Sequence, residues 1–141
     1  MKGIATLIRL AKRNLDELRK QQVALENEKA KLLQAIRTLD SKLQSEQALA
    51  AKSPEMATFY GEFAKRIKER QAVLRGEVKA VEEKLVKISE EITEAFAELK
   101  KYEIARDNAA ARAKAEAARK ETIAFDEIAA TQFMRKEKEE S

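Results

Sequence analysis

The sequence predicts an all-α protein, a two-helix antiparallel coiled-coil hairpin whose C-terminal helix is the longer one. Three observations predict this class. Charged residues make up 38% of the 141 residues and aromatic residues 5%, and there are 3 glycines and 1 proline. Such a composition is typical of long helices. Apolar residues also recur with alternating spacings of four and three in both halves, and one break separates the halves.

The first helix is expected over about residues 3–50, because its apolar residues keep the spacing of a coiled-coil seam. One set of seam positions is Ile4, Ala11, Leu18, Leu25, Leu32 and Leu39, and the alternating set is Ile8, Leu15, Gln22, Lys29, Ile36, Leu43 and Ala50. Gln22 and Lys29 interrupt this stripe. A polar residue at a single seam position favours one register or partner at a cost in stability.

The break is expected at about residues 51–54. Pro54 disfavours helical geometry at the residue before it, and its fixed φ suits the first position of a new helix. The Ser53 hydroxyl is placed to cap that helix, and Glu55 complements the positive end of its dipole. A short break between two helices with matching seams predicts an antiparallel hairpin.

The second helix is expected over about residues 54–136, with its own seam in a new phase. One set reads Tyr60, Ile67, Leu74, Val81, Ile88, Ala95, Tyr102 and Ala109, and the other reads Ala64, Gln71, Val78, Leu85, Ile92, Leu99 and Arg106. Gln71 either weakens the seam for partner exchange or fixes its register. Gly76, on the outer face, is either a hinge or a tolerated surface glycine.

The second helix is too long for the first to cover it. Folding back at residues 52–53 places the start of the first helix beside residues near 100, so residues 105–141 are expected to overhang within a single domain of residues 1–141. The overhang is rich in alanine, which favours helix but buries little surface. The charged end from Arg135 is expected to be disordered.

The composition argues against an enzyme. The chain has no cysteine and no histidine, so thiol chemistry, Cys/His zinc sites and a histidine base are excluded, and we expect no cofactor and no metal site. There is no run of about 18 apolar residues and no secretory leader, so we expect a cytoplasmic protein without direct membrane insertion. The 29 basic and 25 acidic residues are too evenly mixed to predict nucleic-acid binding.

Two basic clusters are expected to meet where the start of the first helix lies along the second. One holds Lys2, Arg9, Lys12 and Arg13, and the other holds Arg106, Arg112, Lys114, Arg119 and Lys120. A positive end of this kind attracts an acidic partner surface and speeds docking. A third patch, Lys65, Arg66, Lys68 and Arg70, is interpreted as solvated surface.

The C-terminal third carries a resemblance to a known family. Lys101-Tyr102-Glu103, the Ala/Arg-rich stretch after it, Arg119-Lys120-Glu121-Thr122 and Asp126-Glu127-Ile128-Ala129 are similar to the C-terminal signature of the FliJ family of flagellar export proteins. The length, the Leu-rich first helix and the central break resemble that family too, so the similarity covers essentially the whole chain. The YscO-type stalks of virulence secretion systems share the architecture.

The resemblance implies a central stalk in the pore of a hexameric, FliI-like export ATPase, contact with an FlhA-like export gate protein and a part in recycling export chaperones. It implies a monomer when free, peripheral to the inner membrane at the flagellar export apparatus. The partner-binding residues that we expect are Arg9, Lys12, Arg13, Arg112, Lys114, Arg119, Lys120, Glu121, Asp126, Glu127, Ile128 and Phe133. The alternative is a coiled-coil adaptor that dimerises through Ile123, Phe125, Ile128 and Phe133 of the overhang.

Overall fold

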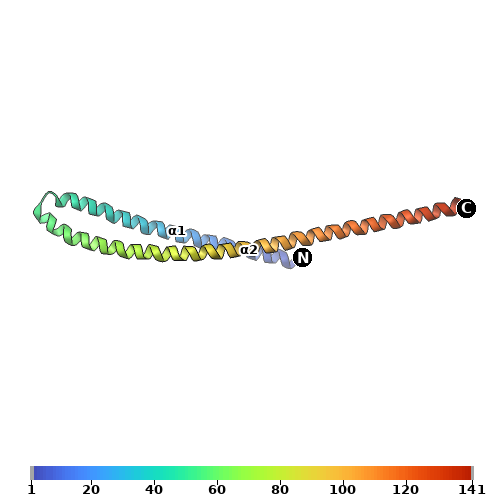
Figure 1. Ribbon diagram of the computed structural model, residues 1–141, viewed down its shortest axis with the longest axis horizontal. Helices are drawn as coiled ribbons and strands as arrows, with labels where there is room; N and C mark the ends of the chain where they lie inside the picture. Colours follow the sequence, from blue (N-terminus) through green and yellow to red (C-terminus); the bar gives the residue numbers. More distant parts are fainter. Residues whose placement is uncertain (1, 141) are drawn as a thin grey trace. The chain divides into compact units, whose positions relative to one another are not determined.

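The computed structural model describes residues 2–140, all of them in two helices and the short turn between these. Helix α1 spans Lys2–Ala50 and helix α2 spans Pro54–Glu140 (Figure 1). The predicted all-α helical hairpin is therefore confirmed. Helix α2 continues beyond the end expected near residue 136, and the expected disorder from Arg135 is corrected. Oppositely charged residues four apart, such as Arg135 and Glu139, support helix at this end.

The turn forms where the proline predicts it. The Ala51 and Lys52 amides donate hydrogen bonds to the carbonyls of Gln47 (3.2 Å) and Leu49 (3.1 Å), which closes α1. The Ser53 carbonyl accepts the first bond of α2 from the Ala57 amide at 3.1 Å. Pro54 therefore stands at the first position of the helix, where a missing amide hydrogen costs nothing. Capping by the Ser53 hydroxyl stays a prediction.

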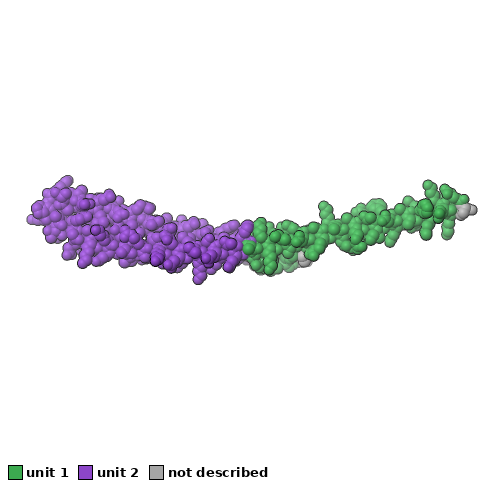
Figure 2. All heavy atoms as spheres, in the orientation of Figure 1, with its two compact units in different colours: residues 1–11, 97–141 green, residues 12–96 purple. Residues whose placement is uncertain are grey.

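Contacts within the chain define two compact units (Figure 2). One comprises residues 12–96, which hold most of the hairpin and its turn, and we call it the hairpin unit. The other comprises residues 1–11 and 97–141, and we call it the terminal unit. The single domain expected from the sequence stays a prediction.

The core of the hairpin unit is the predicted seam. Its buried residues are Leu15, Ala64, Gln71, Leu74, Val78, Val81, Ile88 and Ala95, all of which occupy predicted seam positions. The other predicted seam residues of this unit are half-buried, from Leu18 to Ile92. A two-helix seam has solvent on both flanks, which explains why so many of its residues are only partly covered.

The polar seam residues of the hairpin unit have partners across the seam. Gln71 is 3% exposed, and its Nε2 donates hydrogen bonds to the Ile36 carbonyl (3.2 Å) and to Asp40 Oδ1 (2.6 Å). Lys29 Nζ lies 3.5 Å from Glu82 Oε1. These contacts join α1 to α2 at defined positions and so favour the register-fixing interpretation of Gln71. Gly76 is exposed, and a Cβ there would meet nothing within 4 Å, which favours a tolerated surface glycine.

The terminal unit has a smaller core, in which Ile8 of α1 and Leu99 of α2 are buried. Ile4, Ala11, Tyr102 and Ala109 are half-buried as predicted for the seam, and the expected seam residue Arg106 is exposed instead. Ile4 shares a shallow hollow with Arg106, Ala109, Ala110 and Ala113. The covered part of α2 therefore ends at Ala109, later than the boundary near residue 105 expected from the sequence, and every residue from 110 to 140 is exposed.

Candidate protein-interaction surface

The exposed C-terminal part of α2, residues 110–140, is the candidate functional surface, and we call it the C-terminal arm. Large apolar side chains lie open to solvent along it, with Phe125 63% and Phe133 64% exposed. Ile123, Ile128 and Met134 are exposed as well. Solvent-exposed phenylalanine on a helical segment in which no described residue is buried is typical of a surface that binds another protein.

Local interactions hold the arm in helical form. Alanines fill most of residues 109–118, and alanine has the highest helix propensity. The Arg119 guanidinium donates hydrogen bonds to both carboxylate oxygens of Glu116, at 2.6 and 3.1 Å, and this pairing raises the pKa of Arg119. The Thr122 and Thr131 hydroxyls donate to the carbonyls of Ala118 (3.0 Å) and Glu127 (2.9 Å). The arm is therefore a regular helix, so the side of the helix on which each of its side chains lies is defined.

Charge changes sign along the arm. Arg112, Lys114 and Lys120 are exposed in its first part, where Arg119 is paired within the helix. Glu121, Asp126 and Glu127 follow and are also exposed. A basic segment is therefore followed directly by an acidic one, and a partner surface must match both signs.

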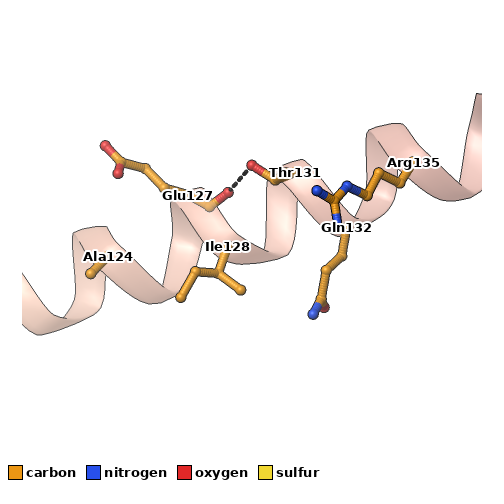
Figure 3. A pocket seen from close by; sticks show the side chains of 6 residues that line it. All are labelled: Ala124, Glu127, Ile128, Thr131, Gln132 and Arg135. Carbon is orange, nitrogen blue, oxygen red and sulfur yellow. Dashed lines mark hydrogen bonds between the residues drawn. The ribbon is translucent and has the colours of Figure 1, made fainter.

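Glu127, at the end of the acidic segment, lines a shallow hollow on one side of the arm (Figure 3). The hollow is lined by Ala124, Glu127, Ile128, Thr131, Gln132 and Arg135. Figure 3 shows the Thr131 hydroxyl directed back to the Glu127 carbonyl, so this hydroxyl is engaged within the helix. Of the predicted partner-binding residues, Glu127 and Ile128 lie in this hollow. Its open form suits an apolar side chain of another protein better than an enclosed small molecule.

The predicted basic residues divide between the two units. Arg9 is exposed in the terminal unit together with Arg106 and the arm, whereas Lys12 and Arg13 are exposed in the hairpin unit. The Lys2 side chain lies outside the described side chains. The meeting of the two basic clusters therefore stays a prediction. Arg106 Nε lies 3.2 Å from Asp107 Oδ1, so the positive charge of Arg106 is partly neutralised by its neighbour.

Three apolar residues of the terminal unit escaped the sequence interpretation. Leu7 and Leu10 of α1 and Ile104 of α2 are 41%, 51% and 57% exposed. The signal for them is present in the sequence, because each is a large apolar residue outside the predicted seam positions. They add apolar surface to the same unit that holds the arm.

The described residues offer little for catalysis. They contain no group of three or more acidic, cysteine or histidine side chains that could hold a metal ion. Among them, too, no helix has the length and apolarity needed to cross a membrane. The half-buried Tyr102 donates a hydrogen bond to Glu98, and this bond raises the pKa of its phenol.

The chain matches the model of a known protein family. Residues 1–138 match the family model described as flagellar FliJ protein. No curated protein and no solved structure matches the chain.

Proposed function

Because the chain belongs to the FliJ family of flagellar proteins, we propose that it is the central stalk of a hexameric export ATPase, with the C-terminal arm inside the ring. Membership in this family of non-catalytic proteins supports a flagellar role related to export. The stalk, its partners and their sites are the proposal. The observation that carries it is the exposure of every residue of the arm from 110 to 140.

The form of the arm fits a narrow space. A single helix measures about 10–12 Å across with its side chains, and less where these are alanine. From the rise per residue, residues 110–140 extend roughly 46 Å along the helix axis. The alanine-rich part is therefore slim enough to pass through a ring, and Ile123, Phe125, Ile128 and Phe133 beyond it provide apolar contacts with the inner wall.

Electrostatics favour docking of the arm in one direction. The exposed Arg112, Lys114 and Lys120 attract an acidic rim, and the Glu121, Asp126 and Glu127 carboxylates beyond them need a basic or neutral lining. Long-range attraction of this kind raises association rates at low ionic strength. The FliI-like ATPase that we propose as partner should therefore bind more slowly as salt is added.

The hairpin unit is proposed to connect the ATPase with the rest of the export apparatus. On its outer surface Phe59 is 75% exposed near the turn, beside the exposed Met56. We assign contact with the FlhA-like export gate protein and with export chaperones to the hairpin unit, because the arm is taken up by the ring. The protein then acts in the cytoplasm, peripheral to the inner membrane.

Stimulation of the cognate ATPase tests the proposal. Addition of the protein should increase ATP hydrolysis and ring assembly. A variant with Arg112, Lys114, Arg119 and Lys120 each changed to glutamate should lose most of the stimulation while its circular dichroism stays helical. The matched control changes Lys65, Arg66, Lys68 and Arg70 of the hairpin unit in the same way.

The control variant should stimulate the ATPase as the unmodified protein does. Equal loss in both variants would show that net charge, and not the arm, governs the effect. Full stimulation by the arm variant would refute docking through its basic segment. Chaperone and gate binding, measured with the same two variants, should follow the opposite pattern if the hairpin unit provides those contacts.

A further inference from the structure

One face of the C-terminal arm repeats the spacing of a coiled-coil seam, and it differs from the seam that faces α1. The face is made of Ala111, Ala115, Ala118, Thr122, Phe125 and Ala129, and Phe133 lies beside its C-terminal end. Their spacings of four and three residues place them on one side of a helix, and the set contains no charged residue. All are exposed, so this second seam has no neighbour within the described chain.

The α1-facing seam becomes charged in the arm. Its next positions after Ala113 are Glu116, Lys120, Ile123, Glu127, Ala130 and Met134, and the three charges among them oppose burial against a second helix. Beyond Ala113 the uncharged stripe of α2 therefore lies on another side of the helix. A partner that covers the new face does not need to displace α1.

The charges beside the new face discriminate between pairing directions. Arg112, Arg119 and Asp126 lie on one flank of the seam, and Lys114 and Glu121 lie on the other. In a parallel pair of identical helices the flank residues meet five positions apart, so Lys114 would face Arg119 and Glu121 would face Asp126. Both contacts join like charges. The parallel arrangement is therefore unfavourable.

An antiparallel pair of the same helices reverses this outcome. With Ala118 opposite Thr122, each Phe125 faces an Ala115, so that a large side chain meets a small one twice. Arg112 then lies beside Asp126 of the second copy, also twice. Near the two-fold axis each Arg119 is already bonded to its own Glu116 at 2.6 Å, whereas the two Glu121 carboxylates face each other without compensation.

We propose that the C-terminal arm binds a second copy of this chain, forming an antiparallel two-helix coiled coil through the face that contains Phe125. This goes beyond the proposed stalk function and does not depend on it. The dimer differs from the free monomer that we expected from the sequence, and it agrees with the alternative of a dimer formed through the overhang, although the face is a different one. Because pairing covers Phe125, a paired arm is closed to any other partner that needs this face, and the fraction of open arms falls as concentration rises.

Analytical ultracentrifugation of the full chain over a range of concentrations tests the pairing. The expected result is a reversible monomer–dimer equilibrium. Ala118→Glu should weaken it at least about tenfold, because it buries a carboxylate in the seam. Ala117→Glu is the matched control, since the neighbouring alanine lies outside the face and is equally exposed, and it should leave the equilibrium unchanged. A monomer at every concentration overturns the proposal and leaves the face to a different helix.

Charge exchange tests the direction of pairing. Arg112→Asp and Asp126→Arg should each weaken the dimer, and the double variant should recover it. Glu121→Gln should strengthen the dimer, because it removes repulsion near the axis. Spin labels on single cysteines, in a chain without cysteine of its own, should show a short distance at position 120, which lies outside the face and level with the two-fold axis, and about 36 Å at position 132. Short distances at both positions would mean parallel pairing and would overturn the proposal.

Discussion

Gln71 offers a quantitative test of how the hairpin unit keeps its register. Its side chain is buried among apolar residues, and its Nε2 bonds to the Ile36 carbonyl and the Asp40 carboxylate across the seam. A hydrogen bond to a charged group contributes about 1.5–3 kcal/mol, and a neutral one about 1 kcal/mol. Burial of a leucine at the same position would contribute about 1.5–3 kcal/mol of its own. The two contributions are similar in size, so exchanging one for the other should leave the stability nearly unchanged.

We expect Gln71→Ala to lower the free energy of unfolding by about 2–3 kcal/mol, because it removes both bonds and leaves a cavity. Gln71→Leu should change it by less than about 1 kcal/mol, because apolar burial offsets the lost bonds. The exposed Asp40 carboxylate is solvated once the glutamine is gone, and the Ile36 carbonyl keeps its helical partner, so neither becomes a buried unpaired group. Urea unfolding followed by circular dichroism measures both values.

A double-mutant cycle with Asp40→Ala isolates the contact itself. The coupling free energy between Gln71 and Asp40 should be about 1–2 kcal/mol, since the bond is short and involves a charge. A coupling near zero would refute the reasoning, and so would Gln71→Leu being as destabilising as Gln71→Ala. Spin-label distances across the seam should broaden in Gln71→Leu, because an apolar residue tolerates neighbouring registers that the amide disfavours.

Further predictions concern α2 and its contacts with α1. Gly61→Ala and Gly76→Ala should each raise the free energy of unfolding by about 1 kcal/mol in urea titrations, because a Cβ at either position meets nothing within 4 Å and alanine has the higher helix propensity. Lys29→Ala should lower the free energy of unfolding by at most about 1 kcal/mol, because the 3.5 Å ion pair between Lys29 and Glu82 is largely solvated. The loss should be smaller in a chain whose Glu82 is already replaced by alanine. Bonding to Glu98 raises the pKa of Tyr102 above the usual tyrosine value of about 10. Its contribution to stability is therefore present below that value and is lost as pH rises through the higher folded-state pKa. Unfolding above pH 10 should therefore depend less on pH in Tyr102→Phe, and equal slopes would contradict this.

The sequence predicted the core of the hairpin because periodicity and burial have the same cause. Among the described residues, every buried one occupies a position that the four-and-three spacing selects, and Pro54 marks the turn. Flanking positions were harder to predict. Phe63 and Glu103 are half-buried although they lie beside the seam, because cover at such positions depends on how closely the helices approach.

The alignment of the helices along their axes was predicted less well than their faces. A turn at residues 52–53 would pair Gln71 with residues near 33 and 34, yet its partners are Ile36 and Asp40. Each seam side chain fits into a gap between residues of the opposing helix. The axial alignment of α1 against α2 therefore depends on the geometry of the turn as well as on the number of residues between the two partners. The same alignment places Ile4 beside Ala109 and Ala110 and moves the start of the exposed arm beyond residue 105.

Sequence analysis identified the charged residues of the arm as partner-binding candidates. It did not identify which residues of the arm form one binding face. A single unpaired helix has no fixed interior, so periodicity alone cannot distinguish a binding face from a solvated one. The structure adds that every residue from 110 to 140 is exposed, so Phe125 and Phe133 lie with Ala118 on one uncharged and open side of the helix. Phe125 and Phe133 are 63% and 64% exposed, so most of their apolar surface contributes nothing to folding. Their free energy of burial is released only when the arm meets another surface, which makes the arm the part of the chain where binding, and not stability, accounts for the apolar residues.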